Sequence, residues 1–375
     1  MYALLLLLTT LPNLGFPSPA GVIPLRYLWF FFPFLFLVIK KELIILLVAC
    51  TLFFIYPIIA VNFGRNISSY DVGMIAALVL CIFQLTIVYR KPKFYFKFVV
   101  VFFVLNVIYS LIQVLVIKIG LNPSIALLHQ NSHYADYVIP NSSYFPYLPR
   151  YTGLFIESAP FAIYLIFSYL FFSINKMRII FKGLALFLLL LSGSKSGLIF
   201  VFFILLYEIK AFKYINMRMV IFSFFSIIGV GYYFSEYILE FLKVSEYSLG
   251  SLYLRLNTMV TSFSNFFNDS QLLLFGEGVI STSSVIEGEA EMRGLDFFSF
   301  FVLSNGIFGS MILLYPIFLY IKKITTKLAV DEKGFIFMCS CIALMTAGSL
   351  ANYQYTYLLS LLLVTDLNRK ADAHY

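Results

Sequence analysis

The 375-residue chain is 61% apolar and 19% aromatic, and only 12% of its residues carry a charge. So little polar surface cannot cover a water-soluble globule, which excludes soluble enzymes and soluble binding modules. The formal net charge of +8 lies in clusters between apolar runs, which is typical of membrane topology signals and excludes a nucleic-acid-binding surface. The apolar runs are about 17 to 25 residues long, the length of a membrane-crossing helix. We therefore predict an all-α, polytopic transmembrane helical bundle that forms one domain over residues 1–375.

Taken in chain order, about twelve spans are predicted, with both termini in the cytoplasm. They cover residues 2–18, 22–39, 43–63, 71–89, 97–119, 155–174, 178–191, 197–209, 219–235, 296–320, 335–350 and 353–367. The first span is expected to be retained, because MYALLLLLTTLPNLGF lacks the basic region and the cleavage site of a secretory signal. Most Lys and Arg residues fall in alternate gaps, which the positive-inside rule assigns to the cytoplasm. These cations are Lys40, Lys41, Arg90, Lys91, Lys93, Lys97, Lys176, Arg178, Lys182, Lys210, Lys213, Arg218, Lys322, Lys323, Lys327, Lys333, Arg369 and Lys370.

The remaining cations defy this insertion bias, which makes them candidates for binding an anion at the outer face. Two outer segments are long, residues 120–154 and 236–295, but neither is large enough for a folded domain with its own core. All four cysteines lie inside apolar runs, so no disulfide framework or thiolate metal site is expected. His129 and His133 would share a helix face, but a third ligand is missing and no metal is expected.

The first candidate site is the segment RYTGLFIESAP, which begins at Arg150 just before a span. Glu157 follows about two helical turns later, on the same face if the segment is helical. An arginine and a glutamate at a membrane mouth would bind an anionic leaving group and activate a hydroxyl. In the alternative, Arg150 snorkels to lipid headgroups and Glu157 merely pairs with it.

The second candidate site is the turn SGSKSG, residues 192–197. Only about 27 residues, or about 40 Å of helix, separate Lys182 from Lys210, which is too little for two full crossings. A pair of short helices would place Lys195 below the outer surface, in a polar cavity that opens outward. A single crossing is the alternative, but it would put the cations around Lys322 outside. The hydroxyls of Ser194 and Ser196 and the free amides of such a turn suit an anion, although small residues also serve ordinary helix packing.

The large outer loop supplies further candidates. Arg255 lies in SLYLRLNTMVTSF, which we expect to be an interfacial helix on the outer leaflet. Its guanidinium would make a bidentate contact with phosphate oxygens, or, in the alternative, it is solvated or bound to a lipid headgroup. Glu277 stands between two glycines in LLLFGEGV, and Arg293 and Asp296 precede the next span. We assign Glu277, Arg293 and Asp296, with Ser194 and Ser196, to substrate binding.

In their order and spacing these pieces resemble the Wzy-type O-antigen, capsule and exopolysaccharide polymerases and the related O-antigen ligases. The pieces are Arg150 with GLFIE (residues 153–157), SGSKSG, Arg255, LLLFGEGV and LDFFSFFVLSNGIFGS (residues 295–310). The resemblance covers roughly residues 145 to 315. Two departures are Lys195, where the family more often has arginine, and Asp296, where ligase-like members often have histidine. The second departure favours a polymerase over a ligase.

The resemblance implies a C-type membrane glycosyltransferase in the bacterial inner membrane, with its active site facing the periplasm or exterior. Donor and acceptor would be undecaprenyl-diphosphate-linked glycans, and a flippase and a chain-length regulator would be partners. Breaking the bond between the anomeric carbon and phosphate builds negative charge on the departing diphosphate, which Arg150, Lys195 and Arg255 would stabilise, with Glu157 as the base. No cofactor or metal is expected.

Two other functions are compatible with the sequence: an O-antigen ligase, and a transporter or flippase of lipid-linked oligosaccharides. A transporter is expected to show paired halves or broken spans in corresponding positions, and no such symmetry is visible.

Overall fold

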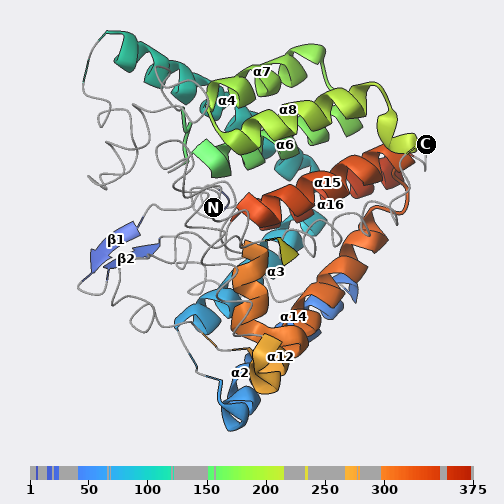
Figure 1. The fold of residues 1–375 in the computed structure, drawn as a ribbon. Coiled ribbons are helices and arrows are strands. Elements are labelled where there is room, and N and C mark those ends of the chain that lie inside the picture. The colour runs from blue at the N-terminus through green and yellow to red at the C-terminus, as the bar shows by residue number, and fades with distance from the viewer. Residues whose placement is uncertain are drawn as a thin grey trace.

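The computed structural model describes residues 6, 15–18, 21–24, 41–65, 67, 69–119, 121, 151–155, 158–214, 233–234, 267–276, 278, 297–346 and 353–372. Apart from one short β-hairpin, the elements in these ranges are helices (Figure 1). The elements are β1 (Gly15–Ser18), β2 (Gly21–Pro24), η3 (Lys41–Leu43), α2 (Ile44–Ala60), η4 (Val61–Phe63), α3 (Ser69–Arg90), α4 (Pro92–Lys118), α6 (Ser158–Ile174), α7 (Ile179–Leu191), α8 (Lys195–Glu208), η6 (Ala211–Lys213), α12 (Ser270–Phe275), α14 (Phe297–Ile324), α15 (Val330–Thr346) and α16 (Tyr353–Asp372).

Three described helices are long and apolar enough to cross a membrane. They are Lys41–Phe63, Pro92–Lys118 and Phe301–Ile324. The predicted spans 71–89, 155–174, 178–191, 197–209, 335–350 and 353–367 correspond to shorter or less apolar helices, and the predicted spans 2–18, 22–39 and 219–235 lie mostly outside the described residues. The described part of the chain is therefore predominantly helical, with three helices whose length and composition suit a membrane.

The β-hairpin corrects the predicted first two spans. Residues Gly15–Ser18, assigned to the end of span 2–18, pair antiparallel with Gly21–Pro24, where span 22–39 was expected to begin. The physical reason is local, because glycine weakens a helix and Pro17 has no N–H to donate to one. A prediction based on apolar composition alone does not detect these glycine and proline residues, which interrupt a helix.

Helix ends differ from prediction where charged or proline residues extend a helix beyond the apolar run. Helix α4 begins at Pro92 instead of residue 97, because proline suits the first helical position. Helix α15 begins at Val330 instead of residue 335, with Asp331 and Glu332 in its first turn facing the positive end of the helix dipole. Apolar composition therefore predicts the stretch that can lie in the membrane, whereas proline and charged residues determine where each of these helices begins.

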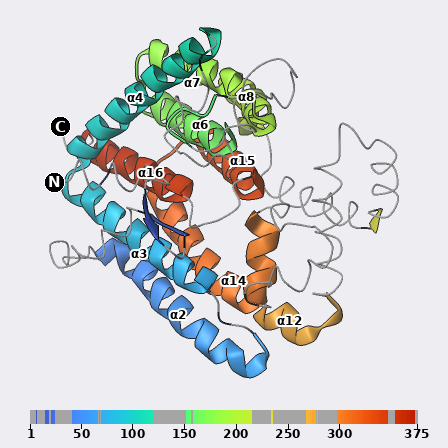
Figure 2. The ribbon, with the colours of Figure 1, turned by 90° about the vertical axis from the view of Figure 1, so that its left-hand side faces the viewer.

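Helix α6 is at the centre of the core. Every side chain from Phe161 to Phe172 is buried, and the helix packs against α7, α8, α15 and α16. Figures 1 and 2 show α4, α6, α7 and α8 in the upper part of the molecule and α2, α12 and α14 in the lower part, with α16 between them. Buried polar side chains join the helices, since Gln84 Nε2 donates to Tyr95 Oη and Ser360 Oγ, each at 3.1 Å.

Several of the predicted cytoplasmic cation clusters meet at one end of the molecule. Lys182 forms a 3.2 Å ion pair with Glu208, which joins the start of α7 to the end of α8. Arg369 of α16 donates to the carbonyl of Lys327 and pairs with Glu332 of α15, while Phe212 of η6 packs against Gly334. We call this end, at the right of Figure 1, the cation-rich end.

Candidate functional site

The short helix pair predicted around SGSKSG is confirmed. Helix α7 has 13 residues and α8 has 14, so each is about 20 Å long, less than the roughly 30 Å of bilayer hydrocarbon. The two helices pack against each other, and the Lys182–Glu208 ion pair joins the start of α7 to the end of α8 at the cation-rich end. The Ser/Gly turn therefore lies at the opposite end of this hairpin (Figure 1), and the alternative of a single crossing is wrong.

Buried serines organise the turn. Ser192 Oγ donates to the carbonyl of Leu189 at 2.7 Å and accepts from the amide of Ser194 at 3.4 Å. Ser194 Oγ and Ser196 Oγ share a 2.6 Å hydrogen bond, and all three serines are at most 5% exposed. Gly193 adopts a left-handed φ of +61°, which a side chain would oppose. The turn is thus a compact polar structure at the end of two apolar helices.

Lys195 is the first residue of α8. At this position the backbone N–H groups have no partner within the helix, and the helix dipole is positive, so an anion is favoured. Ser194 occupies the N-cap position but makes no side-chain capping bond, because its hydroxyl bonds Ser196 instead. The side chain of Lys195 is outside the described part of the structure. Its backbone nevertheless shows that the predicted turn lysine opens a helix.

Residues 152–154 of the predicted segment RYTGLFIESAP are held in place by two amide side chains of α4. Gln113 Oε1 accepts from the backbone amides of Thr152 and Gly153, and Asn106 Oδ1 accepts from that of Leu154, each at 3.1 Å. Gln113 Nε2 also donates to the carbonyl of Gly153 at 3.2 Å. These bonds bind the loop before α6 firmly to α4.

Gly153 fits this loop because it has no side chain. Its φ is +55°, and a Cβ would lie 2.7 Å from the ring of Phe161 and 2.9 Å from Asn106 Oδ1. Tyr151, two residues earlier, is 8% exposed, and burial raises the pKa of its hydroxyl above the ordinary value. The Tyr151 hydroxyl therefore stays neutral at physiological pH.

Sequence reasoning missed Asn106 and Gln113. The signal was present, since Asn106, Ser110 and Gln113 recur at helical spacing within an otherwise apolar helix, and all three are buried. A polar stripe of this kind in a membrane helix marks a face that meets other protein groups instead of lipid.

A third arrangement joins α12 to a bend in α14. The backbone of α14 is non-helical at Gly306, with φ 62° and ψ −173°, and both figures of the ribbon show the helix bent where α12 meets it. A Cβ on Gly306 would lie 2.5 Å from the amide nitrogen of Gly276, and one on Gly276 would lie 2.4 Å from the carbonyl oxygen of Ser304. The Gly278 amide donates to that carbonyl at 3.0 Å. Two segments of backbone thus touch directly.

A buried ion pair lies beside this contact. Arg65 Nη1 donates to Asp71 Oδ2 at 3.2 Å, and both residues are only 2% exposed. Arg65 Nη2 also donates to Asp71 Oδ1. Arg65 reaches α14 as well, where Nε donates to the Ser304 carbonyl and Nη2 donates to Asn305 Oδ1, each at 3.3 Å. Tyr56 Oη lies 2.6 Å from the carbonyl oxygens of both Phe275 and Asn305. We call these residues, with Gly276 and Gly306, the α12–α14 junction.

Arg65 is one of the cations outside the predicted cytoplasmic clusters, but sequence reasoning did not single it out. Its acidic partner is near in sequence, whereas its partners on α14 are 239 and 240 positions away. An arginine in the short gap between two spans, followed by an aspartate at the start of the second span, is the signal that could have indicated the pair.

The structure describes only part of the predicted site. Ser194, Ser196 and the backbone of Lys195 come together in the α7–α8 turn. Arg150, Glu157, Arg255, Glu277, Arg293 and Asp296 lie outside the described residues. Within the described part, no group of three or more His, Cys, Asp or Glu side chains is arranged to hold a metal ion. Comparison of the chain with protein-family models, curated proteins and solved structures finds no match.

Proposed function

We propose that this chain is a polysaccharide polymerase, which joins undecaprenyl-diphosphate-linked repeat units at the outer face of a bacterial cytoplasmic membrane. The observation that carries the proposal is the α7–α8 hairpin. It is too short to cross a bilayer fully, and at its end away from the cation-rich end it holds a lysine at a helix N-terminus among buried serines. A lysine at the N-terminus of a short helix, on the side opposite the cation-rich end, would suit the diphosphate of a lipid-linked glycan.

The reaction requires stabilisation of a leaving group. The acceptor hydroxyl oxygen forms a bond to the anomeric carbon of the donor, while the bond from that carbon to the diphosphate oxygen breaks. The departing diphosphate gains negative charge, which Lys195, the first turn of α8 and the predicted arginines Arg150 and Arg255 would stabilise. Glu157 would take the acceptor proton.

The loop held by Gln113 and Asn106 supports this arrangement. It lies between Arg150 and Glu157 in sequence, and its amides at Thr152, Gly153 and Leu154 are fixed by hydrogen bonds to α4. A catalytic group gains from a rigid mount, because a displacement of about 1 Å costs on the order of a hundredfold in rate.

The test is the length of the surface glycan in cells that depend on variants of this chain. Lys195→Ala is expected to yield glycan only one repeat unit long, whereas Lys323→Ala, an exposed lysine at the cation-rich end, should retain the native length distribution. Lys195→Arg should restore part of the polymer, because it keeps the charge but changes its geometry.

Other outcomes would reject the proposal. Native chain lengths from Lys195→Ala at equal protein levels would remove the α7–α8 turn from the mechanism. Long chains that accumulate on the lipid carrier would indicate a ligase, and repeat units that never reach the outer face would indicate a flippase.

A further inference from the structure

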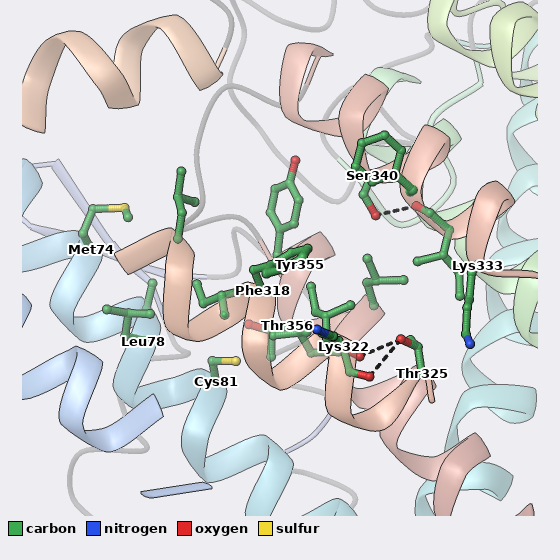
Figure 3. Close-up of a pocket in the computed structure, with 18 residues that line it drawn as sticks. Met74, Leu78, Cys81, Phe318, Lys322, Thr325, Lys333, Ser340, Tyr355 and Thr356 are labelled. Atoms are coloured by element: carbon green, nitrogen blue, oxygen red, sulfur yellow. Dashed lines mark hydrogen bonds between the residues drawn. The ribbon is translucent and has the colours of Figure 1, made fainter. Parts of the chain in front are cut away.

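A cavity of about 580 Å³ lies between α3, α14, α15 and α16. Its walls are mostly apolar side chains, and Met74, Leu78, Leu314, Phe318, Ile336 and Leu359 represent the four helices (Figure 3). Two of its hydroxyl groups are already bonded to the backbone, since Ser340 Oγ donates to the Ile336 carbonyl at 2.7 Å and Thr325 Oγ1 to the Ile321 carbonyl at 2.8 Å. Such walls favour hydrocarbon over a polar ligand.

The cavity is elongated along α14. Its lining on this helix extends from Leu314 to Thr325, which is about 16 Å at the rise of an α-helix. This is roughly half of the 30 Å hydrocarbon thickness of a bilayer, the depth of one leaflet. The Thr325 end is the cation-rich end, because α14 finishes there at Ile324 beside Lys322 and Lys323.

Two lysines line the cavity at this end, Lys322 and Lys333, and both are exposed. Figure 3 shows Thr325 and Lys333 on the opposite side of the cavity from Met74 and Leu78. Neither lysine forms an ion pair with any described residue. Among the described residues, the acceptor of Lys333 Nζ is the carbonyl of Thr326, at 3.1 Å.

Two of the nearby acids are already neutralised, whereas Asp331, in the first turn of α15, forms no ion pair with a described residue and can offset only one of the two lysine charges. Glu332 pairs with Arg369 at 3.0 Å, and Asp366 pairs with Lys370. The two lysines at the mouth therefore present positive charge that an external anion can compensate. Apolar walls one leaflet deep, with two cations at the headgroup level, match the shape and charge of an anionic lipid.

We propose that this cavity binds one acyl chain of an anionic phospholipid from the cytoplasmic leaflet, with its phosphate between Lys322 and Lys333. The lipid-linked substrate of the proposed polymerase is not the occupant, because its diphosphate would lie at the opposite end, near the α7–α8 turn. The phospholipid site therefore stands whether or not the chain polymerises glycans.

The experiment is native mass spectrometry of the full chain in detergent, titrated with phosphatidylglycerol or with phosphatidylcholine of the same acyl chains. The intact protein is expected to retain phosphatidylglycerol at least tenfold more strongly. The pair Lys322→Gln and Lys333→Gln should abolish this preference, whereas Lys323→Gln with Lys327→Gln, which removes the same charge from lysines that do not line the cavity, should preserve it. Each lysine near a membrane surface contributes about fivefold in affinity for anionic lipid.

A second variant tests the cavity itself. Leu78→Trp should fill the apolar space and lower phosphatidylglycerol retention about tenfold, and Ala77→Leu is the milder version if the tryptophan variant does not fold. Unchanged retention in the filled variant, or an equal loss in the control pair of lysines, would overturn the proposal. So would displacement of phosphatidylglycerol from the cavity by equimolar undecaprenyl phosphate, since the occupant would then be a prenyl lipid.

Discussion

Gly153 sets the conformation of residues 151–155, directly before α6. Its left-handed φ and the 2.7 Å approach that a Cβ would make to Phe161 leave no room for another residue. Asn106 stands on the other side, and its Oδ1 is already used by the amide of Leu154. Phe161 cannot move away without losing its packing in the core, and Asn106 cannot move away without losing its hydrogen bond to the Leu154 amide.

We expect Gly153→Ala to lower the free energy of unfolding by about 1–3 kcal/mol, because it adds backbone strain and overpacking at one site. The matched control is Gly183→Ala in α7, where a Cβ would meet nothing within 4 Å. There alanine should stabilise the helix by about 0.5–1 kcal/mol. Thermal unfolding of the purified variants in detergent measures both, and a loss of equal size at the two positions would contradict the role assigned to Gly153.

At the scale of elements, the α12–α14 junction depends on a buried charge pair. The partners of Arg65 lie in the first turn of α3 and directly before the bend in α14, so one side chain, which follows η4, connects two helices. Tyr56 adds α2 and α12 through its bonds to Asn305 and Phe275. Removing one charge leaves the other buried without compensation.

Arg65→Met should therefore cost about 3–5 kcal/mol in stability, and the double variant with Asp71→Leu should recover much of that loss. Lys182→Met removes half of a solvent-exposed pair, with side-chain exposures of 26% and 46%, and should change stability by less than about 1 kcal/mol. The shift in melting temperature of each purified variant is the measurement. If the double variant were no more stable than Arg65→Met, the cost would lie in lost packing and not in a stranded carboxylate.

Helix positions were predictable from sequence to the extent that they depend on apolar length and on the placement of Lys and Arg. The α7–α8 hairpin followed from the spacing of Lys182 and Lys210, and it is confirmed. The hairpin of β1 and β2 was missed, because a run of prolines and glycines among apolar residues has the composition of a span without its backbone geometry.

The arrangement of the candidate site was less predictable, because it depends on contacts between distant segments. SGSKSG was found as a turn from its own residues. The bonds from Gln113 to Thr152, and from Arg65 to Asn305, join parts of the chain that are 39 and 240 positions apart. No local pattern encodes such a pairing, although isolated polar residues in apolar helices show that some partner is required.

At the scale of the whole molecule, the meeting of the cation clusters predicts how the chain is oriented. Asn268, just before α12, and Lys323, at the end of α14, are both exposed, and α14 extends between their two ends of the molecule. In a background without native cysteines, Asn268→Cys should react with a membrane-impermeant maleimide from outside intact cells. Lys323→Cys should react only after the membrane is opened. Reaction of both from the same side would refute the topology.

The α12–α14 junction also has a consequence for how the chain is made. Asp71 follows Arg65 by six residues, so this pair can neutralise itself as soon as α2 and α3 leave the ribosome. The other acceptors of the guanidinium, at Ser304 and Asn305, are synthesised 239 and 240 residues after it. At translation rates of about 5 to 20 residues per second, that interval lasts more than about ten seconds. An early helical hairpin therefore enters the membrane with its charge already balanced, and the junction closes only after most of the protein has been synthesised.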